Sequence, residues 1–190
     1  MFKAIIATLG LAFTVQANAA PTVFEAINHA QQVSIMDQAK AQGLDWKVGD
    51  QNDYTLDMGF LKGSMTMRLR EIAAEGYWLD QDMDLGFAGK QQAQMLLDPN
   101  TGEVKKMIVG GKEQEIPKSN IEVVEVTEDH ITVPAGTFDC IHARIKDKDT
   151  NKETNAWVNP QLIPLSGMLK TIQPSQFGDV TIELKSFQKN

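Results

Sequence analysis

The sequence predicts a mainly β (α+β) fold, a single curved antiparallel sheet or half-barrel of about nine to eleven strands with an N-terminal helix packed on its concave face. Two observations lead to this prediction. After Gly43, apolar and polar residues alternate along most of the chain, which is typical of half-buried antiparallel strands. Helical periodicity is confined to one segment near the start, and short turn-forming stretches separate the alternating runs.

The chain opens with the pattern of a secretory signal peptide. Lys3 precedes an apolar run that ends at Val15, and residues 17–19 read Ala-Asn-Ala, the small-x-small pattern of a cleavage site. The run of about twelve residues is shorter than the roughly 20 that a membrane-spanning helix needs. We therefore expect a signal peptide at residues 1–19, a single domain at residues 20–190, no membrane span and a periplasmic location.

The composition limits the partners of this domain. The 190-residue chain has a net charge of −7, and loss of Lys3 with the leader makes it more negative. Such a surface repels nucleic acid and anionic membranes, so neither is expected as a partner. Cys140 is the single cysteine; it cannot form an internal disulfide, and it lies far from the cleavage site, where a lipid-bearing cysteine would stand.

The first expected element of the domain is a helix. Thr22 and Glu25 form a capping box, an apolar stripe runs through Ile27 and Val33, and Gly43 can end the helix. Because the stripe is broad, we expect the sheet to enclose this helix on its concave face.

The strands follow in order after Gly43. Clear alternation runs through residues 54–58, 64–70 and 77–87, where Gln81 is the one polar residue on the apolar side. Turns are predicted at residues 98–102 (Asp-Pro-Asn-Thr-Gly) and 110–111 (Gly-Gly). Further strands are expected at residues 103–109, 121–126, 137–146, 154–159, 168–172 and 179–187.

Asp80, Asp82 and Asp84 resemble the start of a calcium-binding loop. Such a loop needs glycine at its sixth position and glutamate at its twelfth, and these positions hold Leu85 and Gln91. The aspartates also alternate with apolar residues. We therefore expect them on the solvated face of a strand.

Cys140 and His142 share one face of a predicted strand, while Ile141 and Ile145 are expected on its core side. This would leave Cys140 partly exposed, unless the sheet is covered on both faces. A cysteine nucleophile needs a base and a lowered pKa, and the sequence supplies no third group to orient the histidine. The three histidines lack metal-ligand spacing, and no catalytic motif is present. We expect no enzymatic activity, no metal and no cofactor.

The apolar strand faces contain several methionines. Methionine is flexible and polarisable, which suits a surface that accepts varied apolar ligands, and concave apolar surfaces bind small molecules. An ordinary filled core explains the same pattern and stays open as an alternative. The side chains expected to line a ligand cavity are Met65, Met67, Leu69, Tyr77, Leu79, Met83, Leu85 and Phe87.

The chain carries a distinctive series of motifs, most of them in its second half. They are residues 46–50 (Trp-Lys-Val-Gly-Asp), 133–140 (Val-Pro-Ala-Gly-Thr-Phe-Asp-Cys), 156–160 (Ala-Trp-Val-Asn-Pro), 167–170 (Gly-Met-Leu-Lys) and 181–184 (Thr-Ile-Glu-Leu), of which the first lies near the start of the domain. In this order they resemble the bacterial exported family known as domain of unknown function 3108, with its TapB-like relatives. The resemblance implies a fold like that of the LolA/LolB lipoprotein carriers, which hold apolar cargo in the concavity of a half-barrel.

The motif residues have structural roles in this interpretation. Pro134 and Gly136 are expected to form a turn, and Phe138 to anchor the strand that follows. Trp157 is expected on the paired strand, and Pro160 to end it. The resemblance carries no functional site.

The leading hypothesis is a soluble periplasmic protein that binds an apolar or lipid-like ligand, or a lipoprotein, in the concavity of the half-barrel. The alternative is an envelope adaptor, a protein-interaction module with a filled core and no small-molecule ligand. A hydrolase whose site no motif reveals is a third, weaker hypothesis, because a fold alone does not assign function.

Overall fold

The fold is taken from a computed structural model, which describes residues 44–116, 120–175 and 178–190. The helix predicted to begin at Thr22 and the signal peptide lie outside these residues. The strands are β1 (Gln51–Asp57), β2 (Lys62–Ala73), β3 (Gly76–Asp84), β4 (Lys90–Leu97), β5 (Val104–Val109), β6 (Lys112–Gln114), β7 (Ile121–Val133), β8 (Gly136–Asp147), β9 (Glu153–Val158), β10 (Met168–Ser175) and β11 (Gly178–Gln188). A 3₁₀ turn, η1 (Gly86–Ala88), joins β3 to β4.

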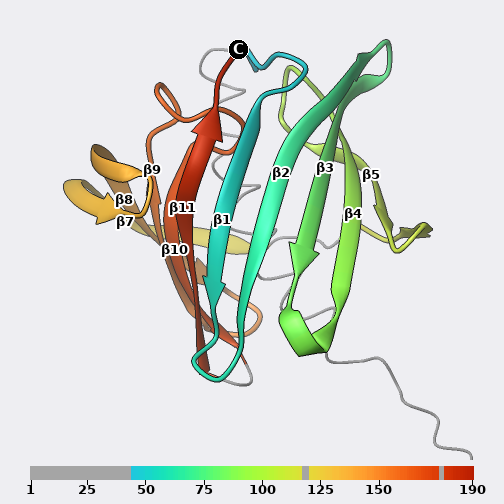
Figure 1. Cartoon of the computed structure of the whole chain (residues 1–190). Helices are drawn as coiled ribbons and strands as arrows, with labels where there is room; N and C mark the ends of the chain where they lie inside the picture. The colour runs from blue at the N-terminus through green and yellow to red at the C-terminus, as the bar shows by residue number, and fades with distance from the viewer. Residues whose placement is uncertain (1–43, 117–119, 176–177) are drawn as a thin grey trace, which may run out of the picture.

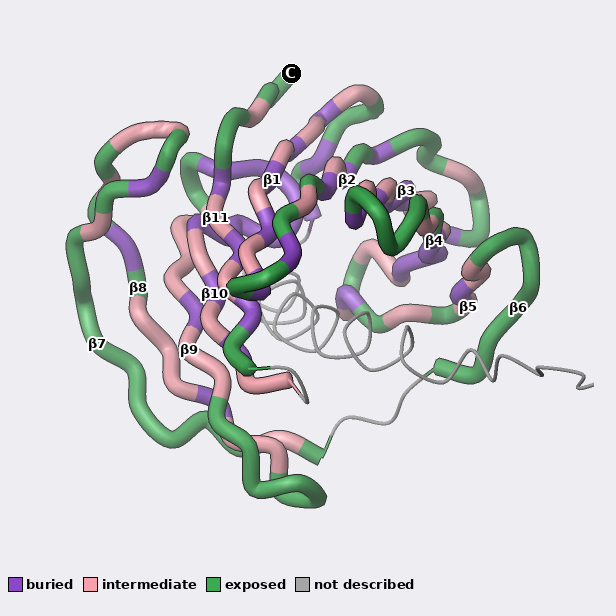
Figure 2. The backbone as a smooth tube through the Cα atoms, turned by 60° about the horizontal axis from the view of Figure 1, so that its bottom comes forward, coloured by how far each residue is buried: buried purple, intermediate pink, exposed green. Residues whose placement is uncertain are grey.

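All these strands form one 11-stranded antiparallel sheet, in the order β6-β5-β4-β3-β2-β1-β11-β10-β9-β8-β7. Strands β1 to β6 are neighbours in sequence order and form one half of the sheet, and β7 to β11 form the other half in the same way. The two halves meet where β11 pairs with β1 (Figure 1). Among the described strands, β6 and β7 are therefore the two edges of the sheet, and Figure 2 shows it curled between them without closing. The predicted single antiparallel sheet and its number of strands are confirmed.

The inner face of the sheet can be followed across strands by direct pairing. One row of partners runs Val126–Ala143–Ala156–Thr171–Ile182–Leu56, from β7 to β1. Since directly paired residues point to the same side of a sheet, this row defines one continuous face. The same face carries the apolar side chains of β2 and β3. It contains most of the hydrophobic core.

The turns form where the sequence places residues suited to them. Asp98 accepts hydrogen bonds on Oδ1 from the backbone N–H groups of Asn100 (2.9 Å) and Thr101 (3.2 Å), which closes the predicted turn between β4 and β5. At the β7–β8 hairpin, the backbone N–H of Ala135 donates to the carbonyl of Leu184 at 3.0 Å. The tip of this hairpin is therefore tied to β11.

One predicted strand is too long. Alternation predicts a single strand over residues 77–87, but β3 ends at Asp84, whose Oδ1 accepts the N–H of Gly86 at 3.0 Å. Gly86 has a φ of 59°, a left-handed value that glycine tolerates and that turns the chain into η1. Phe87 is consequently 84% exposed. The prediction that Phe87 shares the apolar face of β3 is wrong.

Candidate functional site

The other side chains predicted to line a cavity do come together. Met65 pairs with Tyr54 and Met83, and Leu69 pairs with Leu79, on the inner face of β1 to β3. They are closed to solvent in the structure. Exposed fractions are at most 3% for Met65, Met67, Leu69, Leu79 and Met83 and 9% for Leu85, while Tyr77 is half-buried against the core.

In this buried part of the inner face, two amide oxygens have no hydrogen-bond partner within the described part of the chain. They belong to Asn52 and Gln81, which flank Met67 in one row of paired residues. The Asn52 Nδ2 donates to the Tyr54 hydroxyl (3.0 Å) and the carbonyl of Pro164 (2.8 Å). Burial raises the pKa of Tyr54 to about 12, so this hydroxyl is neutral. The Oδ1 of Asn52 and the Oε1 of Gln81 are left as unused acceptors.

The same face opens to solvent toward β7. Along the row defined above, the exposed fraction rises from 0% at Ile182 and 3% at Ala156 to 59% at Val126. Val123 and Ile141, on the same side of β7 and β8, are 49% and 43% exposed. We call the inner face of β7 and β8 the open arm. It continues an apolar core face into solvent, and Figure 2 shows the change from buried β11 to exposed β7.

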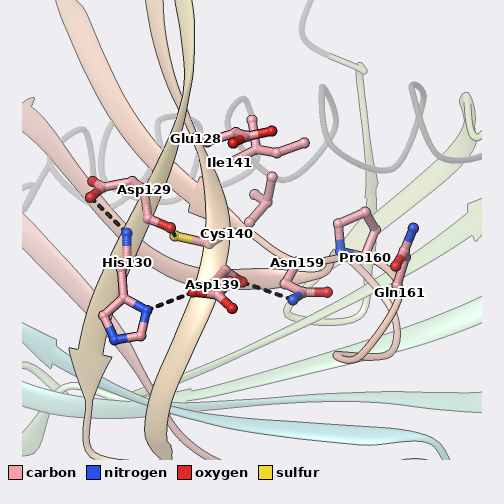
Figure 3. A pocket seen from close by; sticks show the side chains of 10 residues that line it. Glu128, Asp129, His130, Asp139, Cys140, Ile141, Asn159, Pro160 and Gln161 are labelled. Atoms are coloured by element: carbon pink, nitrogen blue, oxygen red, sulfur yellow. Dashed lines mark hydrogen bonds and ion pairs between the residues drawn. The ribbon is translucent and has the colours of Figure 1, made fainter.

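A hollow of about 710 Å³ lies against the open arm. It is lined by residues 128–130 of β7, 139–141 of β8 and 158–161 at the end of β9 (Figure 3). Glu128, Ile141 and Val158 occupy one row of paired residues in its wall. Its volume falls within the range of known ligand pockets, and its lining mixes apolar side chains with carboxylates.

A polar network fixes the β7 wall of the hollow. His130 Nδ1 lies 2.7 Å from Asp139 Oδ1 on β8, and the backbone N–H of His130 donates to Asp129 Oδ1 at 2.7 Å. The indole N–H of Trp157 donates to Asp129 Oδ2 at 2.8 Å. The Trp157 hydrogen bond, followed by that from the His130 backbone, lowers the pKa of the Asp129 carboxyl. Asp129 is therefore a stable carboxylate at neutral pH.

Cys140 is buried, with 8% of its surface exposed, and not partly exposed as a sheet covered on one face alone would leave it. It belongs to the hydrophobic core, against which the partly buried Phe138 and Trp157 pack. Desolvation, with the nearby charges of Asp129 and Asp139, raises the pKa of its thiol. A protonated, buried thiol is not a nucleophile.

His142 lies on the outer face of β8, where Trp157 and Asn155 contact its ring. Its ring stacks on Trp157 with centroids 4.4 Å apart and an interplanar angle of 5°, and its Nε2 lies 2.9 Å from Asn155 Oδ1. In the part of the chain that the structure describes, no three His, Cys, Asp or Glu side chains are grouped to hold a metal ion. Within the same ranges, no helix has the length and apolar character to cross a membrane.

The edge strand β7 is the feature of this region that the sequence largely missed. Its 13 residues pair with β8 alone, and its outer edge has no partner among the described residues. Side chains on both of its faces are mostly exposed, including Val124 and Thr127. The predicted strand stops at residue 126, because Thr-Glu-Asp-His at residues 127–130 has no apolar alternation.

The motif residues lie around the same region. Pro134 is in the β7–β8 turn and Gly136 begins β8, while Phe138 contacts Phe187 edge-on, with ring centroids 6.5 Å apart. Trp157 is on β9, which ends at Val158, and Pro160 follows in the wall of the hollow.

Comparisons with known proteins give only distant likenesses. No family profile matches the chain, and no curated protein matches it. The chain is similar to a candidate exported protein with a YmcC-like fold from Bacteroides fragilis, at 11% identity and a TM-score of 0.41, over 77% of this chain and 99% of that one. A chain of the Pseudomonas aeruginosa MucA/MucB complex matches at 8% sequence identity and a TM-score of 0.44. The match covers 85% of this chain and 56% of that one.

A candidate lipoprotein from Parabacteroides distasonis matches at 12% identity and a TM-score of 0.38, over 76% of this chain and 97% of that one. Because identities and TM-scores are low, these likenesses carry no argument about function. The resemblance to domain of unknown function 3108, and to the LolA/LolB-like fold, stays a prediction.

Proposed function

We propose that this chain is an exported protein-binding module and that its working surface is the open arm with the free edge of β7. The observation that carries the proposal is the outer edge of this 13-residue strand, which has no partner strand among the residues that the structure describes. An unpaired edge offers a row of backbone N–H and C=O groups to another chain, and strand addition at such an edge is a common mode of protein recognition.

The side chains beside this edge support the same role. Val126 and Ile141 present exposed apolar surface on the inner side, next to the hollow. By contrast, the side chains of the methionine-rich face, which is predicted to bind a ligand, are buried. The predicted leader at residues 1–19 supports an extracytoplasmic, periplasmic location. No catalytic role is part of this proposal.

Substitution on the open arm tests this function. The purified Val126→Asp variant is compared with wild type for capture of envelope proteins from producing cells. Val48→Asp is the matched control, because Val48 is 55% exposed and Val126 is 59% exposed, but Val48 lies outside the open arm. We expect Val126→Asp to lose a captured protein that Val48→Asp retains. Equal capture by both variants and wild type would refute the proposal.

A second candidate function is binding of an apolar ligand that carries a hydrogen-bond donor, on the methionine-rich inner face. The unpartnered oxygens of Asn52 and Gln81 favour it, because a buried acceptor without a donor is costly and a ligand could satisfy it. Native mass spectrometry after mild purification tests this candidate. A co-purifying ligand that is lost in Gln81→Met would support it, and a protein that carries no ligand would contradict it.

A further inference from the structure

We infer that the segment recognised at β7 is an extended strand of a different protein in which apolar and basic residues alternate. This inference rests on the proposed function and names the chemistry of the partner. The inference is based on the difference between the two faces of β7. A partner strand added at the free edge would extend both faces, so its alternate side chains would lie beside each of them.

The inner face of β7 is apolar at Val123 and Val126, and Glu128 follows on the same face toward the hollow. Val123 and Val126 lie there, paired with Ile145 and Ala143 of β8, and both valines are about half exposed or more, at 49% and 59%. Inward-pointing residues of an added strand would lie beside these valines. Apolar side chains at those positions would extend the core face and bury the valines.

The outer face of β7 is acidic. Glu122, Glu125 and Asp129 lie on it, paired with Lys146, Arg144 and Cys140 of β8, and residues 121–133 contain no lysine or arginine. These carboxylates are only partly neutralised by the protein.

The counter-charges beside the outer face of β7 come from Lys146, which pairs with Glu122, and from Arg144 and Lys148. The Arg144 guanidinium lies 3.2 Å from Glu125 and also 3.9 Å from Glu153, so one cation serves two carboxylates. The Lys148 amine is 3.8 Å from Glu122, at the edge of ion-pair distance. Outward-pointing basic residues of a partner would therefore meet unbalanced negative charge, which favours a strand with lysine or arginine at alternate positions.

The same charges disfavour a second copy of this chain as the occupant. Pairing β7 of one copy with β7 of another would place acidic residues of the two strands beside one another, and like charges across strands are destabilising. The net charge of −7 adds a general repulsion between copies. A basic partner strand is attracted by both features.

Binding of synthetic peptides to the purified protein tests this inference. The probe is a capped ten-residue peptide that alternates valine and lysine. The comparison peptides are a rearranged sequence of the same composition without alternation, and a peptide that alternates valine and glutamate. The protein variants are Glu125→Lys and its matched control Glu113→Lys, which changes an exposed, ion-paired glutamate on the other edge strand, β6.

We expect the alternating valine–lysine peptide to bind more tightly than both comparison peptides. Glu125→Lys should weaken its binding by about five- to tenfold, since one attractive cross-strand charge contact becomes repulsive, and Glu113→Lys should leave binding unchanged. The inference is overturned if the rearranged peptide binds equally well, if both variants have the same effect, or if the protein dimerises through β7. If peptides show no preference while Val126→Asp still abolishes partner capture, only this inference fails.

Discussion

The carboxylate of Asp129 on β7 accepts a hydrogen bond from the indole N–H of Trp157 on β9, at 2.8 Å. This contact reaches across β8, the strand between them, and joins the edge strand to the body of the sheet. An edge strand is ordinarily among the least protected parts of a fold. The contact therefore holds β7 in position while leaving its outer edge free.

Asp129→Asn should weaken the protein in a pH-dependent way. The Trp157 and His130 hydrogen bonds lower the Asp129 pKa in the folded state below its ordinary value of 3.8. A carboxyl with a lowered folded pKa stabilises the fold above its unfolded pKa, and this contribution is lost as pH falls through the folded pKa. Melting temperatures should differ between variant and wild type at pH 7 and converge at acid pH. A difference that does not change with pH would contradict the role of the charge.

Trp157→Phe provides the companion measurement for this contact. It removes the indole donor while keeping an aromatic ring beside His142. In wild type, the melting temperature should fall as the Asp129 carboxylate is protonated at acid pH. We expect Trp157→Phe, like Asp129→Asn, to make this fall smaller. If it leaves the fall unchanged, a different carboxyl is responsible, because Asp57 and Asp98 also have lowered pKa values.

Gln81→Met should stabilise the protein by about 1 kcal/mol, because it removes a buried oxygen that has no donor. The two side chains have similar volume, so repacking is small. The lost interaction is the hydrogen bond from Gln81 Nε2 to the sulfur of Met65. Urea unfolding measures the change, with Gln92→Met, on an exposed side chain, as the control. A clear loss of stability in Gln81→Met would show that the oxygen has a partner in solution.

The thiol of Cys140 should react slowly with alkylating reagents in the folded protein. Its burial limits access, and its raised pKa keeps it protonated at neutral pH. We expect labelling at pH 7 to be about 100-fold slower or more than in urea. Equal rates in both conditions would mean that the β8–β9 region opens readily.

Gly167→Ala should disturb the wall of the hollow. Gly167 has a φ of 66°, and a Cβ there would lie 2.7 Å from the Cα of Pro160, which lines the hollow. Gly59→Ala is the control, since Gly59 has a φ of 77° with nothing within 4 Å of an added Cβ. We expect Gly167→Ala to cost about 2 kcal/mol more in unfolding free energy than Gly59→Ala. Equal losses would mean that the loop adjusts without strain.

The sequence was informative where one face of a strand is buried. Alternation at residues 64–70 places Met65 and Met67 correctly on the inner face of β2, because burial imposes a period of two. It fails at residues 127–130 of β7, where both faces are exposed and no period is imposed. It also fails at Phe87, since continued alternation cannot reveal the turn at Gly86.

The open arm itself could not be read from the sequence. The row that joins exposed Val126 to buried Ile182 depends on register between strands that are distant in the chain. Single-strand patterns carry no information on that register, nor on which strands end at a sheet edge. For the same reason, the sequence showed Gln81 as a polar residue on an apolar face but not that its oxygen lacks a donor.

The most direct test of the protein-binding proposal is photo-crosslinking in producing cells. A photoreactive phenylalanine analogue replaces Thr127, which is exposed on β7, and in a control protein it replaces Glu113 on the opposite edge strand, β6. We expect a discrete protein adduct from position 127 and none from position 113. Absence of an adduct at position 127, or the same adducts from both positions, would contradict the conclusion that β7 is the binding edge.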